Sequence, residues 1–250
     1  AAAGAATAAA AARAHSPWEL LRLRSCRGPW APGQSSKRAT NLGREENHFF
    51  GREDEQRALT ELMETRSGFI TVLGPPGTGK TRLTKHWAAE HLSSGGVKSA
   101  WFCDLTEART EEGTIQAVAS ALGVSLTTTK DGVAALAELV GLAIKNLGVT
   151  LIVIDNAEQV VQWVGPLVEG WWKQATEASF IVTSQVPTGV SMEQRMPLAP
   201  LALPSAEDSD TPCPAVQLFV DRAQSVKPSF EQTSDNQADI AAIVLALDGL

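Results

Sequence analysis

Cysteine is scarce in this sequence, and the three cysteines that are present lie far apart. Cys26, Cys103 and Cys213 do not have the spacing of a metal site, and their odd number does not suit a disulfide framework. We therefore expect reduced thiols and a cytoplasmic protein. Long apolar runs are also missing, because charged residues interrupt the most apolar region, 133–154. A membrane span needs about 18 or more consecutive apolar residues, so none is expected.

Several motifs of other protein classes are absent as well. His86 and His91 are five residues apart, whereas a zinc-binding pair on one helix face is separated by about four. Ser184 and Ser191 lack the G-x-S-x-G setting of a hydrolase nucleophile. The Asn-Lys-x-Asp pattern that recognises guanine does not occur either. If the chain binds a nucleotide, adenine is therefore favoured over guanine.

Basic residues are sparse after the first 40 positions. The formal net charge is −7, yet residues 1–40 contain six basic side chains and one acidic side chain. The rest of the chain is therefore strongly acidic, which argues against direct nucleic-acid binding through phosphates. The Ala-, Arg- and Ser-rich segment 1–40 is interpreted as a low-complexity, disordered leader. A transit peptide and upstream sequence joined to a fragment are the alternatives.

The most informative positive feature is the segment 74–81, GPPGTGKT, which has the phosphate-binding pattern G-x-x-x-x-G-K-[ST]. The backbone amides of 77–81 would cradle the phosphates, because Pro75 and Pro76 have no N–H group. Lys80 would neutralise the β- and γ-phosphates, and the Thr81 hydroxyl would coordinate Mg²⁺. The predicted nucleotide-binding residues of this region are Gly74, Gly77, Thr78, Gly79, Lys80, Thr81 and the following Arg82.

Apolar runs that predict buried strands alternate with segments of helical spacing. Strands are predicted at 69–73, 97–105, 150–155 and 180–184, and helices at 53–64, 81–92, 114–122, 132–145 and 162–174. Such alternation predicts an α/β fold with a parallel sheet flanked by helices. Two further helices are predicted at 215–226 and 237–247, after a connector rich in Pro, Ser and Asp. We therefore divide the chain into the leader 1–40, a P-loop NTPase domain 41–204 and the start of a small helical domain, 205–250.

Three further residues at or after strand ends complete the predicted site. Asp155 ends the apolar run 151–154 and would hold Mg²⁺. Glu158 would orient or deprotonate the attacking water, although a solvated glutamate at a helix start fits nearly as well. Thr183, with its neighbour Ser184, would hydrogen-bond the γ-phosphate or that water. The predicted catalytic residues are Lys80, Asp155, Glu158 and Thr183, and the predicted metal ligands are Thr81 and Asp155. Asp104 equally fits a turn cap and has no assigned role.

Three more motifs are the segments 49–55, FFGREDE, 151–158, LIVIDNAE, and 180–187, FIVTSQVP. In this order they resemble the hhGRExE element, the Walker B motif and the sensor strand of the STAND class of signal-transduction ATPases. That class includes the NB-ARC proteins and bacterial regulators of the AfsR and LuxR-like type. The segments 215–223 and 247–250 resemble their helical lid. The resemblance implies that Phe50, Gly51 and Arg52 lie against the adenine and ribose.

The same resemblance implies an ATP/ADP-operated switch with Mg²⁺ as cofactor. Such a switch controls an output such as transcription, through protein partners or self-association on activation. A general ATPase with steady turnover and a nucleotide-bound interaction scaffold are the alternatives. Two positions depart from the family pattern: Gln185 stands where an arginine often contacts the γ-phosphate, and Asn156 where a second acidic residue is common. Slow or absent hydrolysis is therefore expected, because a cation near the transition-state charge is missing.

We predict that Gln185→Arg increases the rate of ATP hydrolysis, because it restores a cation where the family carries one. Steady-state phosphate release from the variant and the wild-type protein, at equal Mg-ATP, measures the effect. An unchanged rate would show that the absent cation is not what limits hydrolysis.

Overall fold

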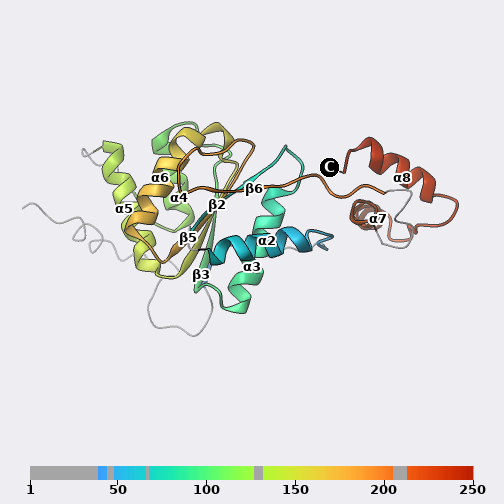
Figure 1. Ribbon diagram of the computed structural model, residues 1–250, viewed down its shortest axis with the longest axis horizontal. Coiled ribbons are helices and arrows are strands. Elements are labelled where there is room, and N and C mark those ends of the chain that lie inside the picture. Colours follow the sequence, from blue (N-terminus) through green and yellow to red (C-terminus); the bar gives the residue numbers. More distant parts are fainter. Residues whose placement is uncertain (1–38, 44–47, 66–67, 127–131, 205–212, 250) are drawn as a thin grey trace, which may run out of the picture. The chain divides into compact units, whose positions relative to one another are not determined.

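A parallel β-sheet forms the centre of the chain from residue 38 onward (Figure 1). The computed structural model describes residues 39–43, 48–65, 68–126, 132–204 and 213–249. The six strands of these residues are β1 (Ala39–Thr40), β2 (Phe69–Leu73), β3 (Ser99–Asp104), β4 (Thr150–Asp155), β5 (Ala178–Ser184) and β6 (Gln194–Pro197). They are ordered β1-β3-β4-β5-β2-β6, and every neighbouring pair is parallel. The predicted leader lies outside the described residues, apart from its last two positions.

Helices connect the strands and continue beyond them. They are α2 (Glu53–Glu64), α3 (Lys80–Ser94), α4 (Glu111–Ala121), α5 (Gly132–Leu147), the short 3₁₀ helix η1 (Ala157–Gln159), α6 (Val161–Gln174), α7 (Pro214–Val226) and α8 (Gln237–Ala246). Within the described part of the chain, no helix combines the length and the apolar character that crossing a membrane requires.

The central strand β4 shows why the sheet needs helices on both faces. All six of its residues are buried. Ile152 and Ile154 belong to one core, whereas Leu151 and Val153 belong to another. Successive side chains of a strand point to opposite faces, so a continuous apolar run has to be covered twice. Helices α4, α5 and α6 cover one face, and α2 and α3 cover the other (Figure 1). This confirms the predicted α/β class.

The two edge strands, β1 and β6, were not expected from the sequence. β6 is short, and of its four residues Met196 alone is buried. It lacks the apolar run that identifies a covered strand, and its backbone pairs with β2 nonetheless. β1 has two residues and pairs with β3. Edge strands need little apolar sequence because one side of each has no strand neighbour.

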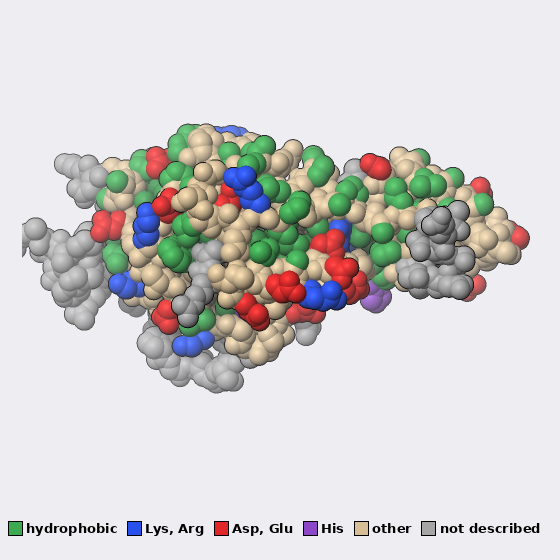
Figure 2. Space-filling view, in the orientation of Figure 1, with side chains coloured by type: hydrophobic (Ala, Val, Ile, Leu, Met, Phe, Trp, Pro, Cys, Tyr) green, Lys and Arg blue, Asp and Glu red, His purple; other side chains and the backbone are tan. Residues whose placement is uncertain are grey.

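The exposed surface of α2 is acidic, as the charge distribution of the sequence suggests. Figure 2 shows Asp and Glu side chains gathered over this helix, with few Lys and Arg between them. Its exposed acidic residues are Glu53, Asp54, Glu61 and Glu64. Leu59 on the opposite side of the helix is fully buried. The helix is thus amphipathic, with its apolar residues directed to the core that α3 shares.

Helices α7 and α8 pack on each other through a small apolar cluster of their own. Ala215, Ile240 and Val244 form its buried centre. Phe219 and Phe230 meet edge to face, with ring centroids 6.3 Å apart. Both helices therefore exist where the sequence pattern predicts them.

We predict that Ile152→Ala lowers the free energy of unfolding by about 2–5 kcal/mol, because it opens a cavity in a fully enclosed part of the core. Ile243→Ala is the matched control, since Ile152 is 0% exposed and Ile243 is 44% exposed. Urea denaturation measures both changes. Equal effects of the two substitutions would contradict this description of the core.

Candidate functional site

The glycine-rich loop connects β2 to α3, at the carboxyl end of the sheet where ligands bind in this fold class. Gly77 and Gly79 both have φ of +86°, a backbone conformation that glycine adopts without strain. Gly74 is required for a different reason: a Cβ atom there would lie 2.6 Å from the carbonyl oxygen of Leu198. The loop therefore needs glycine at three positions, and it leads directly into α3, which begins at Lys80.

The Lys80 ammonium folds back over the loop that precedes it. Its Nζ donates hydrogen bonds to the carbonyl oxygens of Gly74, at 2.8 Å, and Pro75, at 2.9 Å. Burial lowers the pKa of Lys80, and the negative charges of Glu158 and Asp155 oppose that shift. A cation held by two neutral carbonyls in a partly dry site is available to a stronger partner, and a phosphate oxygen is such a partner.

Asp155 ends β4 and lies beside the start of α3. Its side chain is almost fully buried, with 2% of the residue exposed. The Thr81 hydroxyl lies 2.8 Å from its Oδ1 and 2.9 Å from its Oδ2, and the Thr183 hydroxyl donates to Oδ1 at 2.5 Å. Burial raises the pKa of Asp155, while the hydrogen bonds from Thr183 and Thr81 act against the rise.

The oxygen atoms gathered around Asp155 fit a hard divalent cation. Mg²⁺ prefers carboxylate and hydroxyl oxygens and retains several waters in nucleotide sites. Asp155 and Thr81 supply one carboxylate and one hydroxyl in direct contact. The carboxylate is desolvated without a cation bonded to it among the described residues, so a bound cation would offset the cost of burial. The residues present therefore fit the predicted metal.

Thr183 is fully buried on β5, and its hydroxyl is already engaged. Besides donating to Asp155, its Oγ1 accepts a hydrogen bond from the Asn156 backbone amide at 3.1 Å. The Asn156 side chain donates to the Thr106 hydroxyl at 2.9 Å and lies 3.3 Å from Asp104 Oδ1. Thr183 thus contacts Asp155 directly. Its expected contact with the γ-phosphate or water stays a prediction.

Glu158 lies in η1, and its negative charge favours the protonated form of Lys80, which raises the pKa of that lysine. Gln185, directly after β5, donates from Nε2 to Glu158 Oε1 at 3.2 Å. The other oxygen, Oε2, is enclosed and has no hydrogen-bond partner among the described residues. The sequence identified both positions but not their contact, because the two residues are far apart in the chain.

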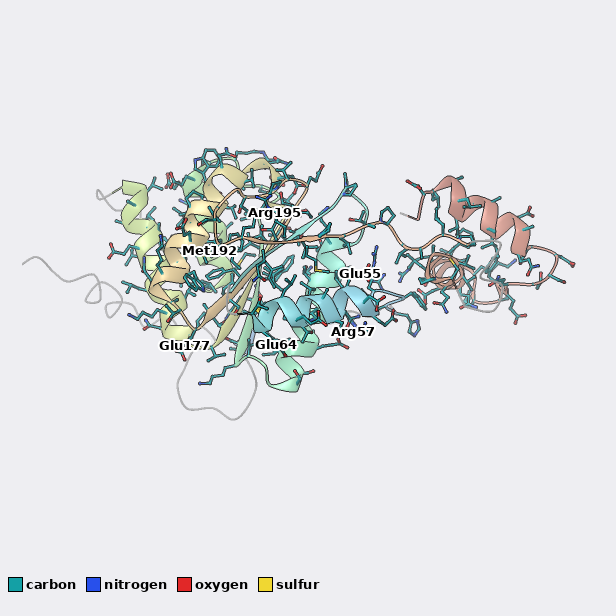
Figure 3. The ribbon with its side chains drawn as sticks, viewed as in Figure 1. Glu55, Arg57, Glu64, Glu177, Met192 and Arg195 are labelled. Atoms are coloured by element: carbon teal, nitrogen blue, oxygen red, sulfur yellow. The ribbon has the colours of Figure 1, made fainter. Side chains whose placement is uncertain are left out.

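Arg52 contacts the phosphate loop itself. Its Nη2 donates to the Thr78 carbonyl oxygen at 3.1 Å, and its Nη1 lies 2.6 Å from Glu55 Oε1. Glu55 lies in the first turn of α2 (Figure 3). Arg52 precedes that helix with φ of 78°, a left-handed conformation that is costly for arginine. The guanidinium is therefore used to connect this segment to the loop, a role that the sequence did not indicate.

The other residues predicted to bind the base lie in the same segment. Gly51 faces α7, since a Cβ atom there would lie 2.9 Å from Pro214 Cβ. The Phe50 ring lies near His48, with centroids 6.1 Å apart. Arg82 donates from Nη2 to the His48 carbonyl oxygen, so it contacts this segment. Segment 48–52 thus contacts both the phosphate loop and α7 directly.

Sheet, glycine-rich loop and strand-end aspartate together define a P-loop ATPase domain. Residues 48–196 match the family of AAA ATPase domains, and the chain belongs to that family. The sequence motifs and the fold of the chain both indicate a P-loop ATPase.

Two proteins of Mycobacterium tuberculosis are related to this chain. The uncharacterized protein Rv0894 is 26% identical over 202 residues, which cover 81% of this chain and 48% of that protein. Rv0890c, whose name assigns it provisionally to the HTH-type transcriptional regulators, is 30% identical over 182 residues, 72% of this chain and 19% of that protein. The chain therefore spans about half the length of the first relative and about a fifth of the second.

A solved structure with the same fold is the Orc1 protein of Aeropyrum pernix in complex with DNA. The similarity has a TM-score of 0.51 at 19% sequence identity and covers 72% of this chain and 56% of that one. At this identity the likeness establishes the fold alone.

We predict that Asp155→Asn raises the melting temperature of the nucleotide-free protein at neutral pH. Burial raises the folded-state pKa of Asp155 above its unfolded value, so ionisation costs stability as the pH rises through that folded value. Asparagine removes this cost, and the gain should vanish below about pH 4, where the unfolded aspartate is also protonated. Scanning calorimetry at several pH values measures the difference.

The exposed Asp235→Asn substitution is the matched control and should leave the melting temperature nearly unchanged. A lower melting temperature for Asp155→Asn at neutral pH would contradict the assignment of a desolvation cost to this carboxylate.

Proposed function

We propose that this chain is the ATP/ADP-binding module of a STAND-type signal-transduction switch. The observation that carries the proposal is the direct bonding of Thr81 to Asp155 beside the Lys80 ammonium. In this arrangement one hydroxyl, one carboxylate and one cation converge where the amides of the glycine-rich loop begin α3. This combination is suited to a triphosphate and its metal.

The predicted residues take the following roles in the proposal. The amides from Gly77 to Thr81 hold the phosphates, and Lys80 exchanges its two loop carbonyls for phosphate oxygens. Thr81 and Asp155 hold Mg²⁺, which would neutralise charge on the β- and γ-phosphates when bound. Glu158 accepts the proton of the attacking water. Phe50, Gly51 and Arg52 border the adenine and ribose, with the Arg82 side chain supporting their segment.

The contacts of segment 48–52 with α7 support a switch in preference to a simple nucleotide store. His48 Nδ1 lies 2.8 Å from Asp221 Oδ1, and Gly51 meets Pro214. A ligand that moves this segment therefore changes contacts with α7 directly. Proteins of this kind act when an ordered phosphate site biases an element with two stable positions. We accordingly propose 41–204 as the NTPase domain and 205–250 as the start of the lid.

The proposal also includes the output that the switch controls and the partners through which it acts. The name of the relative Rv0890c supports control of transcription as one output. The acidic surface over α2 (Figure 2) supports action through protein partners or self-association, and not through direct binding of this segment to nucleic acid. Free Cys103 and Cys213 support a cytoplasmic location.

We predict that Lys80→Ala abolishes retention of adenine nucleotide. Nucleotide released on denaturing the purified protein, after incubation with Mg-ATP, is measured by chromatography. Lys98→Ala is the matched control, because Lys98 is exposed and lies before β3, outside the site. Absence of adenine nucleotide from the wild-type protein would refute the site assignment.

The same preparation separates the proposed switch from its alternatives. Tightly held ADP with negligible turnover favours the switch, whereas steady turnover favours a general ATPase. A scaffold predicts that Lys80→Ala leaves partner binding intact.

A further inference from the structure

The Arg52 guanidinium is enclosed between the start of α2 and the phosphate loop. Its side chain is 7% exposed, and its Nη1 lies 2.6 Å from Glu55 Oε1. Its Nη2 donates to the Thr78 carbonyl oxygen at 3.1 Å. A guanidinium is a planar fork whose donors have fixed directions. The contact with Glu55 therefore sets the orientation in which the guanidinium meets the loop.

The contact with Thr78 also determines where the next amide of the loop points. No peptide bond among the described residues is cis. In a planar trans peptide, the C=O group and the N–H group that follows it point in opposite directions. Arg52 holds the carbonyl oxygen of the peptide that joins Thr78 to Gly79. The Gly79 N–H is therefore directed away from the guanidinium.

The Gly79 amide is available to a ligand. Gly79 is the N-cap of α3, and its N–H has no acceptor among the described residues. Thr78 before it is buried, and its hydroxyl donates to the Pro75 carbonyl oxygen at 2.9 Å. Unpaired amides at the start of a helix favour an anion. An amide held in a fixed direction at this position is suited to a phosphate oxygen.

The backbone at Arg52 has a conformation that is costly for arginine. Its φ is 78° and its ψ is 14°, which lie in the left-handed region. Its carbonyl oxygen accepts the first hydrogen bond of α2, from the Gln56 amide at 2.8 Å. Glycine adopts the same conformation without this cost. The change Arg52→Gly therefore removes the guanidinium and relieves backbone strain at the same time.

We propose that Arg52 is a positioning residue for the phosphate site and that Glu55 acts through it. The guanidinium holds the Thr78 carbonyl so that the Gly79 amide faces the phosphates of a bound nucleotide. A donor that is oriented before the ligand arrives costs less to order on binding. This inference rests on the proposed function, in which the amides of 77–81 hold the phosphates. It assigns the guanidinium to the phosphate loop and not to the adenine or ribose.

Nucleotide affinity provides the first test. Arg52→Gly should weaken Mg-ADP binding roughly tenfold, because the ligand then has to order the loop itself. Glu55→Gln keeps the buried arginine and should weaken binding less, with no further loss in the Arg52→Gly background. Arg57→Ala is the matched control, since Arg57 lies on the same helix and pairs with Asp54 at the same i,i+3 spacing but is 66% exposed. It should change the affinity less than about twofold.

The direction of the Gly79 amide is tested by NMR. Labelling with ¹³C-carbonyl threonine and ¹⁵N-glycine selects Thr–Gly amides, and the chain has two of them, at 78–79 and 188–189. Thr188→Ser removes the second signal and so assigns the first. In the wild-type protein, saturating Mg-ADP should move the Gly79 amide proton downfield as it donates to a phosphate oxygen. In Arg52→Gly at saturating Mg-ADP, this shift should be largely lost.

Unchanged Mg-ADP affinity of Arg52→Gly overturns the proposal. Weaker binding with the full Gly79 shift also overturns it, because the guanidinium then acts on the base, the ribose or the overall stability. Losses from Arg52→Gly and Glu55→Gln that multiply independently remove Glu55 from the proposal. Wild-type protein that binds Mg-ADP without shifting the Gly79 signal overturns this inference and leaves the nucleotide switch standing. Wild-type protein that binds no adenine nucleotide refutes the proposed function itself.

Discussion

Asp155 is an ionisable side chain that the fold buries and then surrounds with hydroxyl groups. Thr81 reaches it from α3 and Thr183 from β5, so three secondary-structure elements meet at one carboxylate. Neutral donors reduce the cost of burying its charge but do not remove it, since burial still raises its pKa. Part of the free-energy cost of burying the charged Asp155 carboxylate therefore remains. A cation there would stabilise the folded protein and create the phosphate site in the same contact.

The phosphate loop also contains polar groups that need hydrogen-bond partners. Its carbonyl oxygens are occupied by cationic side chains, with Lys80 on Gly74 and Pro75, and Arg52 on Thr78. The Arg52 contact leaves the loop amides free, so it is compatible with bound phosphate. The Lys80 ammonium has three N–H donors and uses two of them on these carbonyls. A phosphate oxygen would accept from the third donor or replace one of the carbonyls, so phosphate binding would redistribute the hydrogen bonds of Lys80.

Much of the fold and part of the site could be predicted from local patterns. The run 150–155 is buried on both faces, and the loop 74–81 has glycine wherever the backbone requires it. Both features depend on residues close together in the sequence. The contacts of Thr183, Asn156 and Gln185 join residues separated by up to 52 positions, and no local pattern records them. Edge strand β6 was missed for a related reason, since its pairing with β2 is made by backbone groups that any sequence possesses.

The segment 48–52 shows how local chemistry and long-range packing combine at this site. Arg52 is bonded to the phosphate loop, and Gly51, its neighbour, is packed against Pro214 of α7. Gly51 has φ of +63°, and any side chain there would collide with that proline. Glycine is therefore required for both its conformation and its small size. Consecutive residues of the segment therefore contact the loop and α7. In the proposed switch, this connection would carry a change at the phosphate loop to α7.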